Sequence, residues 1–280
     1  MSYLRRMSLA LCFGALISTP SLADTPLGDD KYQPQIGQDG KDVIWVPTND
    51  ELVNKMLETA KVTDQDIVYD LGAGDGKIPI AAARNYGARA VGIEYNPEMA
   101  ALARRNAQRA GVASKVKIIH GDIFKENFSE ATVVTLYLLP DLNLKLRPTI
   151  LKMKPGTRVV SHAFNMGDWE PDLKIESARA HGYYWVVPAN AAGQWAIEGL
   201  DGGPATLQIS QRYQQIGGNI TIGKKTQPML GAVLSGDKLS FRYLDTSGTL
   251  HSVKATVKGN SLEGEAQGGS LFNNIKGKRQ

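Results

Sequence analysis

Three glycines alternate with other residues in the segment VYDLGAGDGKI. Gly72, Gly74 and Gly76 follow a short apolar run, and Asp70 lies two residues before the first glycine. Glycine loses more backbone freedom on folding than any other residue, so three in one turn indicate that the backbone must approach something closely. A dinucleotide-binding turn, G-x-G-x-x-G, would need a glycine where this chain has Lys77. We expect a different ligand; the alternative is a tight turn that only serves packing.

Two further acids stand at the ends of later apolar runs. Glu94 follows Gly72 by 22 residues and ends the run RAVGIE, and Asp122 lies in the segment GDIF. A carboxylate can accept hydrogen bonds from both hydroxyls of a ribose. The carboxyl ends of parallel strands meet at one edge of a sheet, which predicts that these acids and the glycine turn form one site. The alternative for Glu94 is a solvated charge at a strand end.

Strand-like and helix-like patterns alternate over residues 66–165. The strand patterns are DIVYDL, RAVGIEY, KVKIIHGDIF, ATVVTLYLL and TRVVSHAF, and the helical patterns are KIPIAAARNYG, NPEMAALARRNAQRAG and LNLKLRPTILKMKPG. Such alternation predicts βαβ crossovers and a parallel sheet. LKIESA and YYWVVPA add an antiparallel hairpin at the sheet edge. We therefore predict an α/β fold with a doubly wound, mostly parallel sheet of seven strands.

One more helix is expected before the first strand. Thr48 and Glu51 have the spacing of a capping box, in which the two side chains satisfy backbone N–H groups of the first turn. Apolar residues then recur on one face, which predicts a helix over residues 49–60.

The pattern changes near residue 190. Apolar and polar residues alternate with period two over residues 206–213 and 238–243, and Gly-Asp and Gly-Asn pairs separate the runs. This predicts a small all-β antiparallel, barrel-like domain over residues 190–280. The α/β domain then covers residues 44–189, after a polar lead segment at residues 24–43.

The order of these features resembles the class I, seven-strand S-adenosyl-L-methionine (SAM) methyltransferases. The resemblance implies that SAM is the cofactor. It implies that Asp70 and the backbone of the glycine turn hold the methionine moiety, that Glu94 binds the ribose, and that Asp122 contacts the adenine amino group. The complete set of cofactor-binding residues that it implies is Asp70, Gly72, Gly74, Asp75, Gly76, Glu94, Tyr95, Asp122 and Ile123, of which Ile123 would cover the adenine ring.

A narrower resemblance covers about residues 44–165. The segments WVPT, DLGAGDGKI, GIEYNP and DIFK are similar to those of the small protein-lysine methyltransferases that include the enzyme acting on the ATP synthase membrane subunit. This implies methyl transfer to an amine, with a protein lysine as the leading acceptor and a small molecule as the second. An exported protein that binds SAM or another small ligand without turnover is the rival interpretation.

The segment TLYLLPDLN follows the fourth strand pattern. It lacks the Asn/Asp-Pro-Pro-Tyr/Phe motif of many enzymes that methylate nucleic-acid bases, and the chain has no clustered basic patch, so we expect no nucleic-acid partner. We expect Tyr137 and Pro140 beside the transferring methyl group; the alternatives are a core aromatic and a helix-start proline. His162 is a candidate base, and we expect no metal site because histidines and acids lack ligand spacing.

The first residues have the pattern of a secretory signal peptide. Arg5 and Arg6 precede an apolar stretch that ends in Ser21-Leu22-Ala23, which predicts cleavage after Ala23 and a periplasmic or secreted protein. The apolar stretch is too short to span a membrane in the mature chain. Cys12, the only cysteine, lies within this segment, so the mature protein would have no disulfide. The sequence leaves the oligomeric state open.

Overall fold

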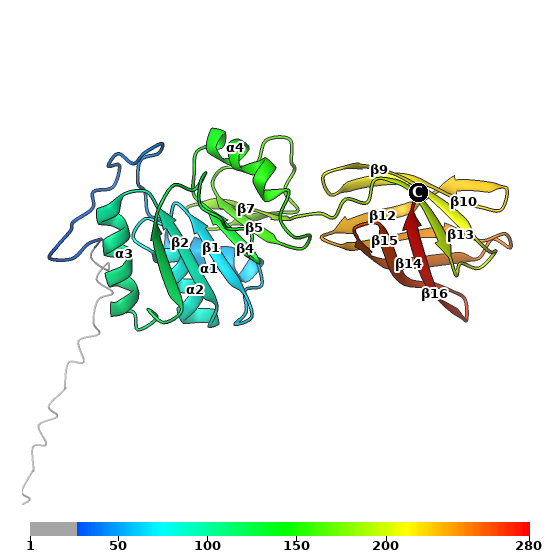
Figure 1. The fold of residues 1–280 in the computed structure, drawn as a ribbon, viewed down its shortest axis with the longest axis horizontal. Coiled ribbons are helices and arrows are strands. Elements are labelled where there is room, and N and C mark those ends of the chain that lie inside the picture. Colours follow the sequence, from blue (N-terminus) through cyan, green and yellow to red (C-terminus); the bar gives the residue numbers. More distant parts are fainter. Residues whose placement is uncertain (1–26) are drawn as a thin grey trace, which may run out of the picture.

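The computed structural model describes residues 27–280, and the predicted signal peptide lies outside the described residues. Two sheets follow one another along the chain (Figure 1). The first sheet has the strand order β3-β2-β1-β4-β5-β7-β6, and all neighbouring pairs are parallel except those made by β7. Its strands are β1 (Ile67–Leu71), β2 (Arg89–Glu94), β3 (Val116–His120), β4 (Val133–Leu136), β5 (Arg158–His162), β6 (Leu173–Glu176) and β7 (His181–Val186).

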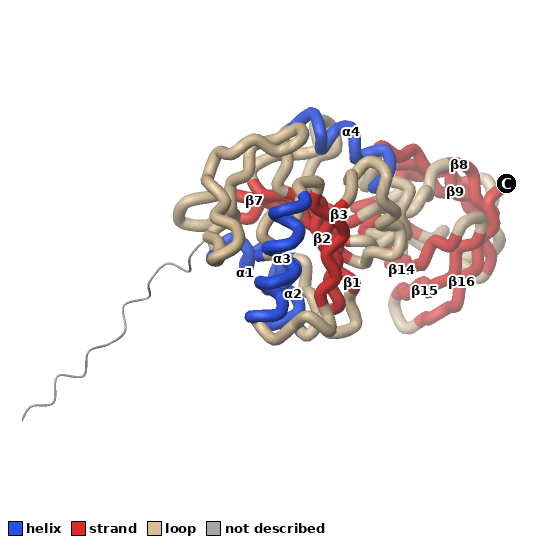
Figure 2. The backbone as a smooth tube through the Cα atoms, turned by 60° about the vertical axis from the view of Figure 1, so that its left-hand side comes forward, coloured by secondary structure: helices blue, strands red, loops and turns tan. Residues whose placement is uncertain are grey.

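Helices cover both faces of this sheet. The helices are α1 (Asp50–Thr59), α2 (Lys77–Tyr86), α3 (Pro97–Arg109) and α4 (Pro140–Ile150). Leu52 and Ala82 of α1 and α2 pack with Val68 in one core, whereas Leu146 of α4 packs with Leu136 in another. Alternate residues of a strand point to opposite faces, so each central strand contributes to both cores. Figure 2 shows α4 apart from the other three helices. The predicted doubly wound, mostly parallel seven-strand fold is confirmed.

The second sheet is antiparallel and nearly closed. Its order is β11-β10-β9-β8-β16-β15-β14-β13-β12, and its inward side chains, such as Trp195, Phe241 and Tyr243, form a separate core. The strands are β8 (Gly193–Glu198), β9 (Ala205–Arg212), β10 (Gln215–Ile222), β11 (Lys225–Pro228), β12 (Leu230–Ser235), β13 (Lys238–Leu244), β14 (Leu250–Lys258), β15 (Ser261–Gly268) and β16 (Leu271–Arg279). The barrel-like architecture predicted from period-two alternation is confirmed.

The turn between β9 and β10 joins the barrel to the first domain. Asp168 accepts hydrogen bonds from Arg212 at 2.9 Å and from Arg147 of α4 at 2.5 Å. The indole N–H of Trp169 donates to the Gln214 side chain at 2.9 Å, and its ring stacks on Tyr213. Of the described helices, none is long and apolar enough to cross a membrane.

The beginning of α1 differs from the expected capping box. Asn49 is the N-cap, and its side chain accepts a hydrogen bond from the backbone N–H of Leu52 at 2.8 Å. The Thr48 hydroxyl instead pairs with the His162 ring at 3.0 Å, and Glu51 faces Lys55 at 3.1 Å. A buried partner on β5 thus engages the threonine, while the next residue serves equally well as a cap.

Candidate active site

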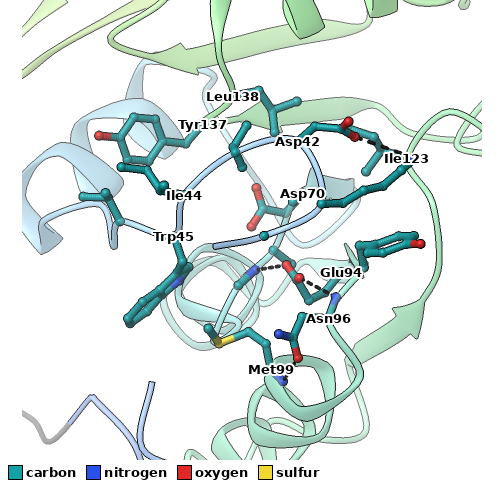
Figure 3. A pocket seen from close by; sticks show the side chains of 18 of the residues that line it. Asp42, Ile44, Trp45, Asp70, Glu94, Asn96, Met99, Ile123, Tyr137 and Leu138 are labelled. Carbon is teal, nitrogen blue, oxygen red and sulfur yellow. Dashed lines mark hydrogen bonds and ion pairs between the residues drawn. The ribbon is translucent and has the colours of Figure 1, made fainter. Parts of the chain in front are cut away.

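A cavity of about 250 Å³ lies at the carboxyl ends of β1, β2 and β4 (Figure 3). This is the edge at which ligands bind in doubly wound sheets. Two of the predicted residues, Gly76 and Pro140, do not line it: Gly76 faces Ala103 of α3, and Pro140 is exposed at the start of α4. The predicted residues that line the cavity are Asp70, Gly72, Gly74, Asp75, Glu94, Tyr95, Asp122, Ile123 and Tyr137.

The glycine turn has the backbone conformation that its sequence suggests. Gly72, Gly74 and Gly76 have φ values of 90°, 55° and 85°, in the left-handed region that side chains with a Cβ rarely adopt. The turn runs from β1 straight into α2, so its backbone faces the cavity. All three glycines are therefore needed for the path of the chain, and the first two also keep the cavity wall free of side chains.

Asp70 is buried at the end of β1. Its Oδ1 atom accepts a hydrogen bond from the Thr135 hydroxyl at 2.6 Å. Burial, together with the nearby carboxylates of Glu94 and Asp75, raises the pKa of Asp70 to about 7, although the Thr135 hydrogen bond acts against this rise. A cation that enters the cavity would stabilise the ionised form of this buried carboxylate.

Glu94 is positioned by two backbone groups. Its Oε2 accepts from the Gly74 N–H at 2.8 Å, and its Oε1 accepts from the Asn96 N–H at 2.8 Å. Burial raises the pKa of Glu94, and these backbone N–H groups partly offset the rise. Each carboxylate oxygen has a second lone pair, so the group retains the capacity to accept two hydroxyl protons from a ligand.

Asp122 lies in the turn after β3 and is already paired within the chain. Its Oδ1 accepts from the Phe124 N–H at 3.0 Å, and its Oδ2 pairs with the Lys41 ammonium at 2.9 Å. These two contacts hold the pKa of Asp122 below its ordinary value, the backbone N–H contributing most. Ile123 lines the cavity beside it. The sequence predicted Asp122 as a site residue but gave no sign of its ion pair with Lys41.

Aromatic side chains form the opposite end of the cavity. Tyr137 follows β4 and stacks on His162 with 3.7 Å between ring centroids, and Phe164 lies 6.5 Å beyond Tyr137. Ala163 has a φ of 62°, a strained conformation that turns the chain so that Phe164 lines the cavity. His162 does not line the cavity; its Nδ1 pairs with Thr48. Burial, with a smaller effect from His181, lowers the pKa of His162 to about 4.

The segment before α1 contributes more of the cavity wall than the sequence suggested. Residues 38–48 all line it, including Lys41 and Trp45. The polar composition of residues 38–42 gives no helix or strand signal, and the only local sign is the apolar run at residues 43–46. Tertiary contacts, not local propensity, place this segment.

The charges around the cavity are strongly unbalanced. Among the residues that the structure describes, only two lysines line it, Lys41 and Lys77, against six acids: Asp39, Asp42, Asp70, Asp75, Glu94 and Asp122. Such a site attracts cations and repels anions over the distance of a Debye length.

Known proteins resemble this chain over the same region. The family model described as the ANTKMT methyltransferase domain matches residues 70–173. A protein-lysine N-methyltransferase from Saccharolobus islandicus is 47% identical over 150 residues, which are 52% of this chain and 93% of that protein. The chain belongs to the same family as this protein-lysine N-methyltransferase. A crystal structure of an RNA methyltransferase from Salinibacter ruber with S-adenosyl-L-homocysteine is 51% identical, covers 52% of this chain and 95% of that one, and has a TM-score of 0.51.

A vertebrate relative matches less completely. The adenine nucleotide translocase lysine N-methyltransferase of Mus musculus is 38% identical over 106 residues, and the matched part is 37% of this chain and 46% of that protein. The chain therefore spans less than half the length of this relative. Together, these comparisons make the chain a SAM-dependent methyltransferase with a barrel appended.

The cavity of this methyltransferase fits SAM in the chemistry of its donors. Buried carboxylates suit the two positive charges of the methionine end, and the spare lone pairs of Glu94 suit the ribose hydroxyls. The glycine turn leaves backbone, not side chains, on the side of the cavity where the methionine moiety is expected. The residue assignments made from the sequence remain predictions within this cavity.

One cluster in the barrel of the methyltransferase was not visible from sequence spacing. Asp201, Asp245 and His251 could offer three metal-ligand atoms within 4.8 Å of one another. His251 already bonds Asp245 at 3.0 Å, and the other oxygen of Asp245 accepts from the backbone N–H groups of Ser247 and Thr249. These bonds are sufficient to explain the cluster as a support of the β13–β14 turn.

Proposed function

We propose that this enzyme transfers the methyl group of SAM to the ε-amino group of a lysine side chain in a protein. The charge around the cavity carries the proposal. Six lining carboxylates against two lysines favour a cationic side chain at the mouth and disfavour the phosphate backbone of RNA. The names of the relatives include both kinds of acceptor, and this charge supports a protein lysine as the acceptor.

The acceptor end of the cavity suits the shape of a lysine. Apolar side chains of Leu139, Leu142 and Phe164 line it beside Tyr137. They would contact the four methylenes of a lysine and exclude water from its amine. Because burial disfavours the charged form, such a wall lowers the pKa of an incoming amine and favours the neutral nucleophile.

When bound, SAM supplies an electrophilic methyl group on a sulfonium sulfur. The chain then needs to align the amine nitrogen with that carbon and sulfur, since alignment accounts for much of the rate of such a displacement. Burial raises the pKa of Tyr137, so its phenol stays protonated and can direct the amine through a hydrogen bond. The incoming ammonium releases its proton to solvent before the apolar wall covers it, and the displacement then gives a methylammonium and a neutral thioether. The candidate base His162 lies outside the cavity lining.

Methyl transfer from tritiated SAM into cell-envelope and ribosomal fractions tests the acceptor. We expect label that protease removes and ribonuclease leaves, and methyl-lysine after acid hydrolysis. A Tyr137→Phe variant should bind S-adenosyl-L-homocysteine normally and transfer at least about tenfold more slowly. Ribonuclease-sensitive label would make RNA the acceptor; label in a small molecule, or binding without any transfer, would support the rival interpretations.

Export is the second part of this proposal. The basic and apolar segment that ends at Ala23 supports it. Fractionation of cells should place the protein in the periplasm with a new N-terminus at Asp24, and an intact N-terminus in the cytoplasmic fraction would contradict export.

A further inference from the structure

The segment that covers the cavity forms a short hairpin, residues 37–45, which we call the lead hairpin. The N–H of Gly37 donates to the carbonyl of Trp45 at 2.8 Å, and the N–H of Trp45 donates to the carbonyl of Gln38 at 2.9 Å. The N–H of Gly40 donates to the carbonyl of Val43 at 2.8 Å and closes the tip. These bonds give a polar segment a defined shape, so its side chains have defined positions over the cavity.

Both ends of the lead hairpin are fixed to the methyltransferase domain. Before it, the side chain of Asp29 is 8% exposed and accepts hydrogen bonds from Arg105 and Arg109 of α3, both at 2.9 Å. After it, Thr48 bonds His162 and the chain enters α1. The hairpin therefore crosses the cavity as a strap between two anchored ends.

Lys41 connects the strap to the far side of the cavity. Its ammonium lies 2.9 Å from Asp122 Oδ2 and 5.1 Å from the centre of the Tyr95 ring. Asp122 and Tyr95 belong to the turns after β3 and β2, so this contact closes the cavity across the strand ends. The other Asp122 oxygen is held by the Phe124 N–H, and Oδ2 keeps a second lone pair for a ligand beside Lys41.

Trp45 of the lead hairpin packs against the glycine turn. Its indole nitrogen lies 2.6 Å from the position that a Cβ atom on Gly74 would occupy. Any side chain at position 74 would displace the indole, so the glycine serves a contact within the chain. Trp45 is half-buried, whereas the other three tryptophans, Trp169, Trp185 and Trp195, are fully buried in the two cores.

We propose that the lead hairpin is the closing wall of the cofactor site. Asp122 Oδ2 has lone pairs for both Lys41 and the adenine amino group of SAM, so the Lys41 pair re-forms over the bound cofactor. Trp45 packs on that cofactor as well as on Gly74. The hairpin opens by breaking the Lys41–Asp122 pair, admits SAM, and closes on it. This inference rests on the cofactor and not on the identity of the acceptor, and the matched family region begins only at residue 70.

Stopped-flow fluorescence of the full chain with S-adenosyl-L-homocysteine tests the closing wall. We expect binding to change tryptophan emission and Trp45→Phe to abolish that change, because Trp45 is the one tryptophan among the described residues that lines the cavity. Lys41→Met should release the ligand about two- to fivefold faster, as expected for a half-exposed ion pair. Lys31→Met is the matched control: it removes the same charge at an exposed position before the lead hairpin and should leave the release rate unchanged.

Salt gives an independent readout. Dissociation from the wild type should accelerate as ionic strength rises, and dissociation from Lys41→Met should respond less, because the screened pair is absent. The proposal is overturned if Lys41→Met and Lys31→Met release the ligand at the wild-type rate, or if Trp45→Phe keeps the emission change. Calorimetry on the same samples separates this from a deeper failure: an absence of binding heat in the wild type would refute the cofactor site itself.

Discussion

At the scale of single residues, the cavity concentrates carboxylates where the chain has little to neutralise them. Asp70, Asp75 and Glu94 all have raised pKa values, in each case chiefly because they are buried. Folding retains these acids at a cost, since an unpaired buried charge is unfavourable. A cationic ligand recovers that cost, which ties the electrostatics of the fold to the charge of its cofactor.

The pKa of Asp70 predicts how cofactor affinity depends on pH. Below about 7 the carboxyl is protonated and loses its attraction for a cation. We expect SAM to bind about five- to tenfold more weakly at pH 6 than at pH 8. S-adenosyl-L-homocysteine lacks the sulfonium charge and should change less, and Asp70→Asn should flatten the SAM profile in calorimetric titrations. Equal pH profiles for Asp70→Asn and wild type would contradict this role.

Glu94 allows a sharper test, because its two backbone hydrogen bonds leave only one lone pair on each oxygen. Glu94→Ala should weaken SAM binding about 10- to 100-fold through the loss of hydrogen bonds to a charged group. Glu98→Ala, at an exposed position of the first turn of α3, is the control. Unchanged calorimetric affinity in Glu94→Ala would refute the ribose assignment.

At the scale of elements, α1 and β5 are joined through the pair formed by Thr48 and His162. Both partners are buried, and Tyr137 stacks on the imidazole from the other side. The neutral imidazole fits this environment, and a protonated one would face an uncompensated burial cost. The position of Tyr137 in the cavity thus depends on the charge state of a residue that does not line it.

This arrangement predicts a loss of stability in mild acid. The folded pKa of His162, about 4, lies below its unfolded value, so its contribution is present above about pH 6.5 and falls as the pH decreases toward 4. A single proton contributes at most about 1.4 kcal/mol per pH unit. Asp70 acts in the opposite direction in the same window, so the measure is the difference between wild type and His162→Gln in urea unfolding at pH 7, 6 and 5. Parallel pH slopes would contradict the assignment.

The elements also show what a sequence pattern can predict. Asp70, Glu94 and Asp122 could be placed together because the apolar runs predict strand ends that share one edge of a parallel sheet and because the resemblance to SAM methyltransferases implies their roles. Lys41 and Trp45 could not be placed from the sequence, because the lead hairpin has no periodic pattern. Its position comes from two tertiary contacts: the hydrogen bond of Asp29 with Arg105 of α3, and the ion pair of Lys41 with Asp122. The sequence pattern predicted Thr48 as part of a capping box for the same reason. Its actual partner, His162, is buried and lies 114 residues away in the chain.

At the scale of the whole molecule, the methyltransferase domain and the barrel are joined through a few side chains. Tyr213 has a φ of 54° at the tip of the β9–β10 turn, and its hydroxyl donates to Asp168 at 3.2 Å. Hydrogen bonds from Arg212 and Arg147, in that order, lower the pKa of Asp168 to about 2, so this carboxylate stays charged at any physiological pH. A second contact places Gly236 against Gly156, where a Cβ on Gly236 would lie 2.9 Å from the Gly156 Cα.

We expect these contacts to couple the unfolding of the two domains. Tyr213→Ala removes the stacking on Trp169 and one bond to Asp168, so a single calorimetric transition should separate into two. Lys224→Ala, in the turn at the opposite end of β10, should leave one transition. Two transitions already in the wild type would show that the interface does not couple the domains.

Helix α4 contributes both to the acceptor end of the cavity and to the contact with the barrel. Leu139 and Leu142 at its beginning face the cavity, and Arg147 two turns later bonds the same carboxylate as Arg212 of the barrel. In evolutionary terms, the residues that hold the barrel beside the acceptor end of the cavity are expected to diverge in step with the barrel and to differ in relatives that lack it.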